Sequence, residues 1–229
     1  MINRGIALLC GLLLGLSLTV SFGVSAATIR LVNSAGEAME NMVVYLQPKH
    51  LDGSHSALAE ESVDNLALPL EVHQKNKQFT PYITVVQKGY ELQFVNDDDI
   101  THHIYSAAGP KRFSFKLRKD NATKTMVFDR VGHVSMGCNV HDWMSGHLLI
   151  VDTPYFGLTD EKGWVSFDSA PDADYSLVIW HPQLLSQDNS LSQEVTLPLP
   201  QALTITVSAL MRDIPSQKSL DDFEFLDGY

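Results

Sequence analysis

Cysteine is scarce in this sequence, with two copies among 229 residues. Basic residues are also few, at 16 against 27 acidic ones, which gives a net charge of −11. A chain of this charge lacks the basic surface that nucleic-acid binding requires. The sequence also lacks internal repeats, a glycine-rich phosphate loop, an HExxH helix and a nucleophile elbow. These absences exclude repeat folds and the common nucleotide-binding, metalloprotease and hydrolase motifs.

Residues 1–27 have the pattern of a signal peptide. Arg4 supplies a positive charge, residues 6–20 are apolar, and residues 24–27 are small, as a cleavage site requires. The apolar run could nearly span a bilayer, so an uncleaved anchor is the alternative. The pattern therefore predicts that the peptide is cleaved and that the mature chain is periplasmic, without a stable membrane span.

The mature chain would keep 15 basic and 27 acidic residues and one cysteine, Cys138. A lone thiol in an oxidising compartment cannot form an internal disulfide, so it is buried and inert, paired between chains, or bound to something. The net charge of −12 would steer the mature chain toward a basic protein partner.

The remaining sequence consists of short apolar runs separated by turns, without a long helical period, and therefore predicts an all-β chain. The expected strands cover 29–32, 42–46, 83–86, 90–95, 102–106, 113–117, 124–128, 131–136, 148–151, 164–167, 175–180, 195–199 and 203–209. We divide the mature chain into a β segment at 28–70, a middle domain at 71–152, a further β region at 153–212 and a mobile acidic tail at 213–229.

The loop expected after residue 136 carries three side chains that bind soft metals. Cys138, His141 and Met144 follow one another at intervals of three, so a tight loop can turn them toward one point. Thiolate and thioether sulfurs are soft ligands, and imidazole is borderline. Two histidines, one cysteine and a weak axial methionine form a blue-copper electron-transfer site.

The second histidine of such a site must come from another part of the chain. His102 is the first candidate, because it follows an Asn-Asp loop and begins a strand. His103 is the alternative, since neighbouring strand residues point to opposite faces and both should not bind one ion. Structural zinc prefers four Cys or His ligands, and methionine is a poor zinc ligand. Core packing of Cys138 and Met144 beside a surface histidine is the remaining alternative.

Residues 79–151 resemble the cupredoxin family, of the plastocyanin and amicyanin type. Phe79-Thr80-Pro81 resembles the family's F-x-P strand, and residues 89–96 match its G-x-x-x-x-F-x-N motif. The loop has the short, amicyanin-like spacing of Cys, His and Met. The resemblance implies a Greek-key β-sandwich that binds copper through four residues, His102, Cys138, His141 and Met144.

The same resemblance implies one-electron transfer to or from a redox protein, for which a basic c-type cytochrome is the candidate. His141 would pass the electron at an exposed apolar edge, with Trp143 as a docking surface. Copper delivery or sensing without fast redox is the alternative, and a scaffold with structural copper is a third hypothesis. We expect no enzymatic activity, because four ligands leave no open position. His103 stands where the family often has an asparagine that braces the Cys loop.

The flanking residues resemble a second family. Residues 29–36 and 43–46, with residues 159–167 and 174–177, are similar to the two halves of a carboxypeptidase-regulatory-like β-sandwich. The sequence of residues 137–144 also resembles that of bacterial chains called methylamine utilization proteins. Either the copper domain is inserted into the small second sandwich, or the N-terminal segment is a separate hairpin. Contact between strand 42–46 and the strands after Gly163 distinguishes the two. The histidines outside the proposed site are expected to be structural or exposed, namely His133, His147 and His181.

Overall fold

The structure is a computed structural model that describes residues 27–49 and 70–218. Within these ranges it contains 16 strands in four sheets, so the expected all-β class is confirmed. No helix in this part of the chain is long and apolar enough to cross a membrane. Most of the predicted signal peptide lies outside the described residues, but its last residue, Ala27, begins β1 and is buried.

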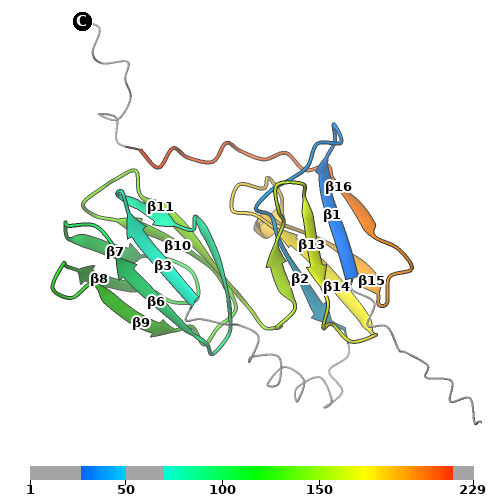
Figure 1. Cartoon of the computed structure of the whole chain (residues 1–229), viewed down its shortest axis with the longest axis horizontal. Helices are drawn as coiled ribbons and strands as arrows, with labels where there is room; N and C mark the ends of the chain where they lie inside the picture. The colour runs from blue at the N-terminus through cyan, green and yellow to red at the C-terminus, as the bar shows by residue number, and fades with distance from the viewer. Residues whose placement is uncertain (1–26, 50–69, 219–229) are drawn as a thin grey trace, which may run out of the picture.

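The strands form two β-sandwiches that lie side by side (Figure 1). The central sandwich contains β3 (Leu70–Lys75), β4 (Gln78–Thr80), β5 (Ile83–Gln87), β6 (Glu91–Asn96), β7 (His102–Ser106), β8 (Phe113–Leu117), β9 (Thr123–Val127), β10 (Gly132–Cys138) and β11 (Ser145–Val151). The flanking sandwich contains β1 (Ala27–Asn33), β2 (Val43–Pro48), β12 (Phe156–Leu158), β13 (Trp164–Phe167), β14 (Asp174–Trp180), β15 (Ser190–Thr196) and β16 (Leu203–Val207).

The central sandwich has one sheet in the order β5-β11-β10-β7-β8 and a second in the order β4-β3-β6-β9. Strands β6 and β8 alternate between buried or half-buried and more exposed residues, because each turns one face to the core. The core lies between the two sheets and includes Phe94, which contacts the rings of Phe113 and Phe115. Both Cys138 and Met144 belong to this core, so two of the four expected ligands are part of it.

The flanking sandwich is assembled from both ends of the described chain. Strand β1 pairs with β13 and β16, whereas β2 pairs with β12 and β14 in the other sheet. The N-terminal strands therefore complete this sandwich and do not form a separate hairpin. The contact that distinguishes the two arrangements is present, with Tyr45 opposite Val178, so the central sandwich is inserted between β2 and β12.

The two sandwiches pack through a third apolar cluster. Strand β11 is buried from Gly146 to Val151, because Leu148 and Ile150 enter the central core while Leu149 and Val151 face the flanking sandwich. A strand that is buried on both faces loses the polar–apolar alternation of a half-exposed one. The cluster on the outer face also contains Val43, Ile83, Val85 and Trp180, which ties the two units together.

Some strands differ from those expected from the sequence. Strands β3 and β12 were not predicted, since β3 contains charged and polar residues and β12 has three residues, one of them glycine. Strand β15 pairs with β14 along the whole of Asp174–Trp180. This pairing places β15 at Ser190–Thr196, whereas the sequence predicted a strand at 195–199. Tertiary pairing decides the register here, because residues 190–194 are largely polar and give no apolar signal.

Candidate metal centre

Two neighbouring strands position the first two expected ligands. His102 is the first residue of β7, and Cys138 is the last residue of β10, with Cys138 opposite Ile104 in the antiparallel pair. Gly137 allows a close approach here, because a Cβ at this position would lie 3.0 Å from the ring of Tyr105. The chain then turns through the ligand loop, residues 139–144, and enters β11 at Ser145.

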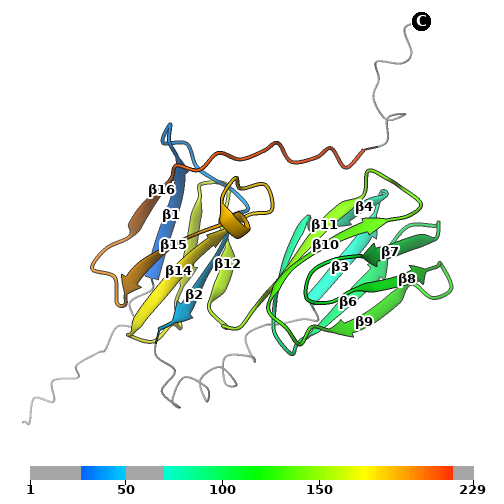
Figure 2. The ribbon, with the colours of Figure 1, turned by 180° about the vertical axis from the view of Figure 1, so that it is seen from behind.

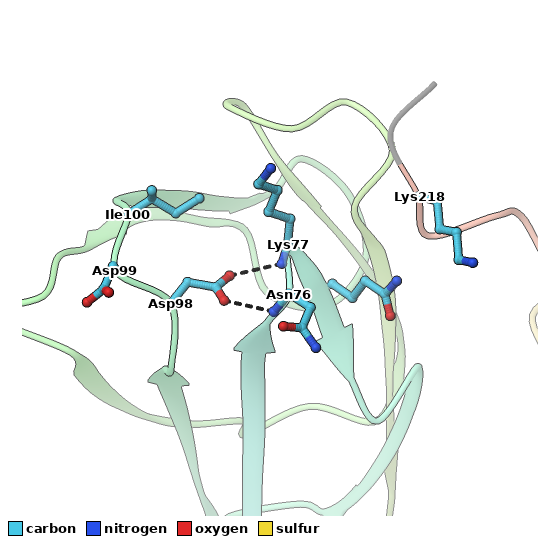
Figure 3. A pocket seen from close by; sticks show the side chains of 7 residues that line it. Asn76, Lys77, Asp98, Asp99, Ile100 and Lys218 are labelled. Carbon is cyan, nitrogen blue, oxygen red and sulfur yellow. Dashed lines mark hydrogen bonds between the residues drawn. The ribbon is translucent and has the colours of Figure 1, made fainter. Parts of the chain in front are cut away.

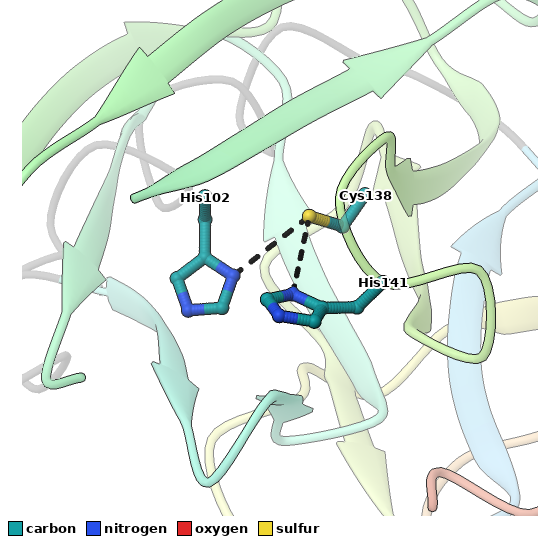
Figure 4. Close-up of side chains that lie close together, drawn as sticks. All are labelled: His102, Cys138 and His141. Atoms are coloured by element: carbon teal, nitrogen blue, oxygen red, sulfur yellow. Dashed lines mark hydrogen bonds between the residues drawn. The ribbon is translucent and has the colours of Figure 1, made fainter. Parts of the chain in front are cut away.

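The ligand loop brings His141 back to the ends of these two strands. The Sγ atom of Cys138 lies 3.8 Å from Nδ1 of His102 and 3.8 Å from Nδ1 of His141 (Figure 4). One ligand atom from each of the three residues lies within 4.8 Å of the others. The side chains are buried, with exposed fractions of 0% for His102, 3% for Cys138 and 7% for His141. Three of the four expected ligands therefore converge in a buried site.

Met144 occupies the last position of the ligand loop. It is 2% exposed and packs in the same apolar cluster as Cys138. Its backbone N–H donates to the carbonyl of His141 at 3.0 Å, which closes a tight turn between these two residues. The turn keeps the backbones of these two residues close together, as their short spacing in the sequence implies.

The surroundings of Cys138 favour the thiolate. Burial alone would raise the pKa of the thiol, but hydrogen bonding with His102 and with the backbone N–H groups of Val140, His103 and His141 outweighs it, so the pKa is lowered. Burial would likewise lower the pKa of His102, but bonds to Cys138 and Asp98 raise it. Metal ions bind the thiolate form of cysteine, so this environment prepares the sulfur for a metal.

Asp98 fixes the far side of the His102 ring. Nε2 of His102 donates to Oδ2 of Asp98 at 2.9 Å. The carboxylate in turn accepts backbone N–H groups from Asn76 at 2.7 Å and Lys77 at 2.9 Å (Figure 3). Burial would raise the pKa of Asp98, but these three donors lower it. With Nε2 protonated, Nδ1 of His102 is left to bind a metal, as in a carboxylate–histidine–metal triad.

We expect Asp98→Asn to weaken Cu(II) binding by roughly 10- to 100-fold, the usual effect of losing a partner that orients a ligand. The carboxylate makes the imidazole of His102 a stronger donor, and this favours the more highly charged oxidation state. The reduction potential should therefore rise in the variant. Titration against a competing chelator and voltammetry measure the two effects. Asp99→Asn, which changes an exposed neighbour, is the control, and equal values for both variants would contradict this role.

His103, the alternative second ligand, is turned away from the site. Its Nε2 atom lies 2.8 Å from the hydroxyl of Ser114, and its Nδ1 atom accepts a hydrogen bond from the Asn139 side-chain amide at 3.2 Å. The backbone N–H of Asn139 also donates to the His103 carbonyl at 3.0 Å. His103 and Asn139 together thus brace the start of the ligand loop, the role that an asparagine has in the family that the sequence resembles.

The surface beside His141 differs from the exposed edge expected from the sequence. His141 is buried at 7% exposure, and its ring centroid lies 5.3 Å from that of the half-buried Trp143. Val140 is 55% exposed and is the open apolar side chain of the loop. Trp143 therefore packs on His141, and Val140 presents the apolar surface next to it.

Three further histidines, His133, His147 and His181, lie at the contact between the sandwiches. Nε2 of His133 and Nδ1 of His147 are 2.9 Å apart, and Nε2 of His147 lies 3.0 Å from the Tyr82 hydroxyl. His181 is 1% exposed and its Nδ1 accepts the backbone N–H of Gln183. Burial lowers the pKa of both His147 and His181 to about 4, so both are neutral at pH 7.

The donor set fits copper. Separations of 3.8 Å between sulfur and nitrogen suit two bonds of about 2.0–2.3 Å to one ion at a trigonal angle. Imidazole, thiolate and a nearby thioether are the ligands of blue copper, whereas structural zinc prefers four Cys or His. Within the described residues, the His, Cys, Asp or Glu side chains that lie close enough in a group of three or more to share an ion are His102, Cys138 and His141.

The solved structures that this chain matches include several copper proteins. A copper-containing nitrite reductase from Thermus scotoductus matches at 23% identity and a TM-score of 0.35, over 37% of this chain and 22% of the reductase. A purple cupredoxin from Nitrosopumilus maritimus matches at 20% identity and 0.32, over 36% and 99% of the two chains. Amicyanin from Paracoccus versutus matches at 17% identity and 0.34, over 39% and 88%. No family model and no curated protein matches.

Proposed function

We propose that this chain is a periplasmic electron carrier that holds one copper ion through His102, Cys138 and His141, with Met144 as a weak fourth ligand. The observation that carries the proposal is the convergence of two imidazoles and a thiol in one buried site (Figure 4). Bound copper would supply a one-electron couple. The sandwich contributes a set of ligands held in place before any metal binds.

Rigid placement of the ligands supports electron transfer in particular. His102 begins β7 and Cys138 ends β10, and these two strands are paired. The ring of His102 is also held by Asp98. Side chains on strands, locked by packing and hydrogen bonds, keep their geometry better than side chains on free loops. A site that changes little between two charge states suits rapid electron exchange. Four protein donors would also leave no position for a substrate, so we propose a carrier and not an enzyme.

The charge of the chain supports a basic redox partner, such as a c-type cytochrome. Acidic residues outnumber basic ones by 27 to 16 in the full sequence. Opposite charges speed the encounter of two proteins, and salt screens this attraction over about 8 Å at physiological ionic strength. Val140, which precedes His141 in the chain, offers an exposed apolar contact for such a partner.

Voltammetry of the copper-loaded protein tests the proposal. We expect a reversible one-electron couple, and a rate of reduction by a basic cytochrome that falls as salt is raised. An acidic electron donor of similar potential is the matched control, and its rate should rise with salt. An irreversible couple, together with ready loss of copper to a chelator, would contradict electron transfer and favour copper delivery or sensing instead.

A further inference from the structure

The chain after β16 connects the flanking sandwich to the ligand end of the central sandwich (Figures 1 and 2). We call residues 208–218 the C-terminal strap. Near its start, Met211 forms a β-bridge with Leu184. Two backbone hydrogen bonds flank this bridge, from Leu185 N–H to Leu210 at 2.8 Å and from Arg212 N–H to Gln183 at 2.9 Å. The strap is therefore fixed to the flanking sandwich at one end.

The other end of the strap is bonded to the central sandwich. Oε1 of Gln217 accepts the backbone N–H of Ser145 at 3.1 Å, and Nε2 of Gln217 donates to the Ser145 hydroxyl at 2.8 Å. Lys218 lines the same pocket as Asp98 (Figure 3). Residues 213–218 belong to the segment expected from the sequence to be a mobile tail, and Gln217 within it is bonded to β11. Residues 219–229 lie outside the described residues.

Ser145 is a sensitive point at which to hold the ligand loop. It directly follows Met144 and is the first residue of β11, where it lies opposite Gly137. The ligand loop lies between Cys138, the last residue of β10, and Ser145, and it carries His141 and Met144. A displacement of Ser145 would thus move the end of the loop that carries the thioether, while Cys138 stays on its strand.

Tyr82 makes a second tie from the flanking sandwich to the same region. The Gln183 side-chain amide donates to the Tyr82 hydroxyl at 2.9 Å. Nε2 of His147 lies 3.0 Å from the hydroxyl on its other side. Hydrogen bonds in a connected network restrict one another, so the flanking sandwich is also tied to β11 at His147, two residues after Ser145.

We propose that Gln217 is a positioning residue for the ligand loop, through which the flanking sandwich sets where Met144 lies. This inference rests on the proposed function for its effect on copper, whereas the hydrogen bonds of Gln217 to Ser145 involve no metal. Since the axial ligand tunes a blue-copper site, the strap gives the flanking sandwich a means of adjusting the copper centre.

The experiment compares Gln217→Ala with Ser216→Ala, an exposed neighbour in the strap, in the full chain. In the metal-free protein, the amide of Ser145 should exchange with solvent roughly 5- to 30-fold faster in Gln217→Ala, because two hydrogen bonds are lost. With Cu(II) bound, the relative intensities of the visible bands and the reduction potential should move away from wild type. Gln217→Glu, whose carboxylate can still accept from the N–H and hydroxyl of Ser145, should restore part of both effects.

The outcomes separate this inference from the proposed function. Wild-type exchange, spectrum and potential in Gln217→Ala would overturn the positioning role, even if the wild-type protein is a blue-copper carrier. Faster exchange with an unchanged spectrum and potential would also overturn it, since the bonds would then be structural alone. If wild-type protein with Cu(II) lacks intense visible absorption, the proposed function fails, whatever the exchange rates show.

Discussion

Replacing Cys138 with serine should remove the intense visible absorption of the Cu(II) protein and weaken copper binding by more than about 100-fold. The hydroxyl of serine is a hard, weakly acidic donor, whereas copper in this kind of site is bound by a soft thiolate. The loss should exceed the roughly 10- to 100-fold effect of removing a partner that only orients a ligand. The absorption spectrum and a chelator competition measure the two parts of the effect.

Met144→Leu is the matched comparison for Cys138→Ser. Both side chains are buried in the same cluster, and leucine keeps nearly the volume of methionine. Because an axial methionine is a weak ligand, this variant should keep the intense absorption with a changed potential. Far-ultraviolet circular dichroism checks that both variants are folded. Retention of wild-type absorption and affinity by Cys138→Ser would show that the sulfur is not a ligand.

Replacing Trp180 with alanine should lower the free energy of unfolding by about 3–5 kcal/mol, as for other buried tryptophans. Trp180 is 3% exposed and its ring centroid lies 5.1 Å from that of His133, across the contact between the sandwiches. The cavity would open against β5 and β11, so amides of these strands should also exchange faster. Urea unfolding followed by circular dichroism and hydrogen exchange measure the two effects.

Trp164→Ala is the control for this stability prediction. Trp164 belongs to the same sandwich but is half-buried outside the contact, where its ring lies 5.6 Å from the guanidinium carbon of Arg30. Its loss should cost about 1 kcal/mol and leave β5 and β11 unchanged. If Trp164→Ala destabilises the protein as much as Trp180→Ala, or if neither affects those strands, the two sandwiches are not coupled through Trp180.

The sequence predicts those strands whose burial leaves a local pattern. Strands β6 and β13 combine apolar residues with nearby turns, and both were expected close to their observed positions. Strand β3 was missed because it holds Glu71, His73 and Gln74, whose placement depends on parallel pairing with β6. Pairing between distant segments leaves no periodic signal in the segment itself, so this part of the fold is fixed by tertiary contacts.

The candidate site likewise contains residues that the local sequence predicts and residues that only folding brings together. Cys138, His141 and Met144 could be proposed because they follow one another at intervals of three in one short segment, and His102 because it begins a strand after a polar loop. The contacts of Asp98 and Gln217 could not be predicted from the sequence. Asp98 lies 40 residues before Cys138 and Gln217 lies 79 residues after it, so only the folded chain brings them near the site. The Asn-Asp run before His102 was the one local signal for Asp98.

The absorption and electron spin resonance spectra of the protein with one equivalent of Cu(II) test the central claim most directly. A thiolate from Cys138 in a trigonal set with His102 and His141 should give strong visible absorption and the narrow copper hyperfine splitting of a blue site. Weak absorption with the wide splitting of tetragonal copper, bound by nitrogen and oxygen alone, would contradict the account.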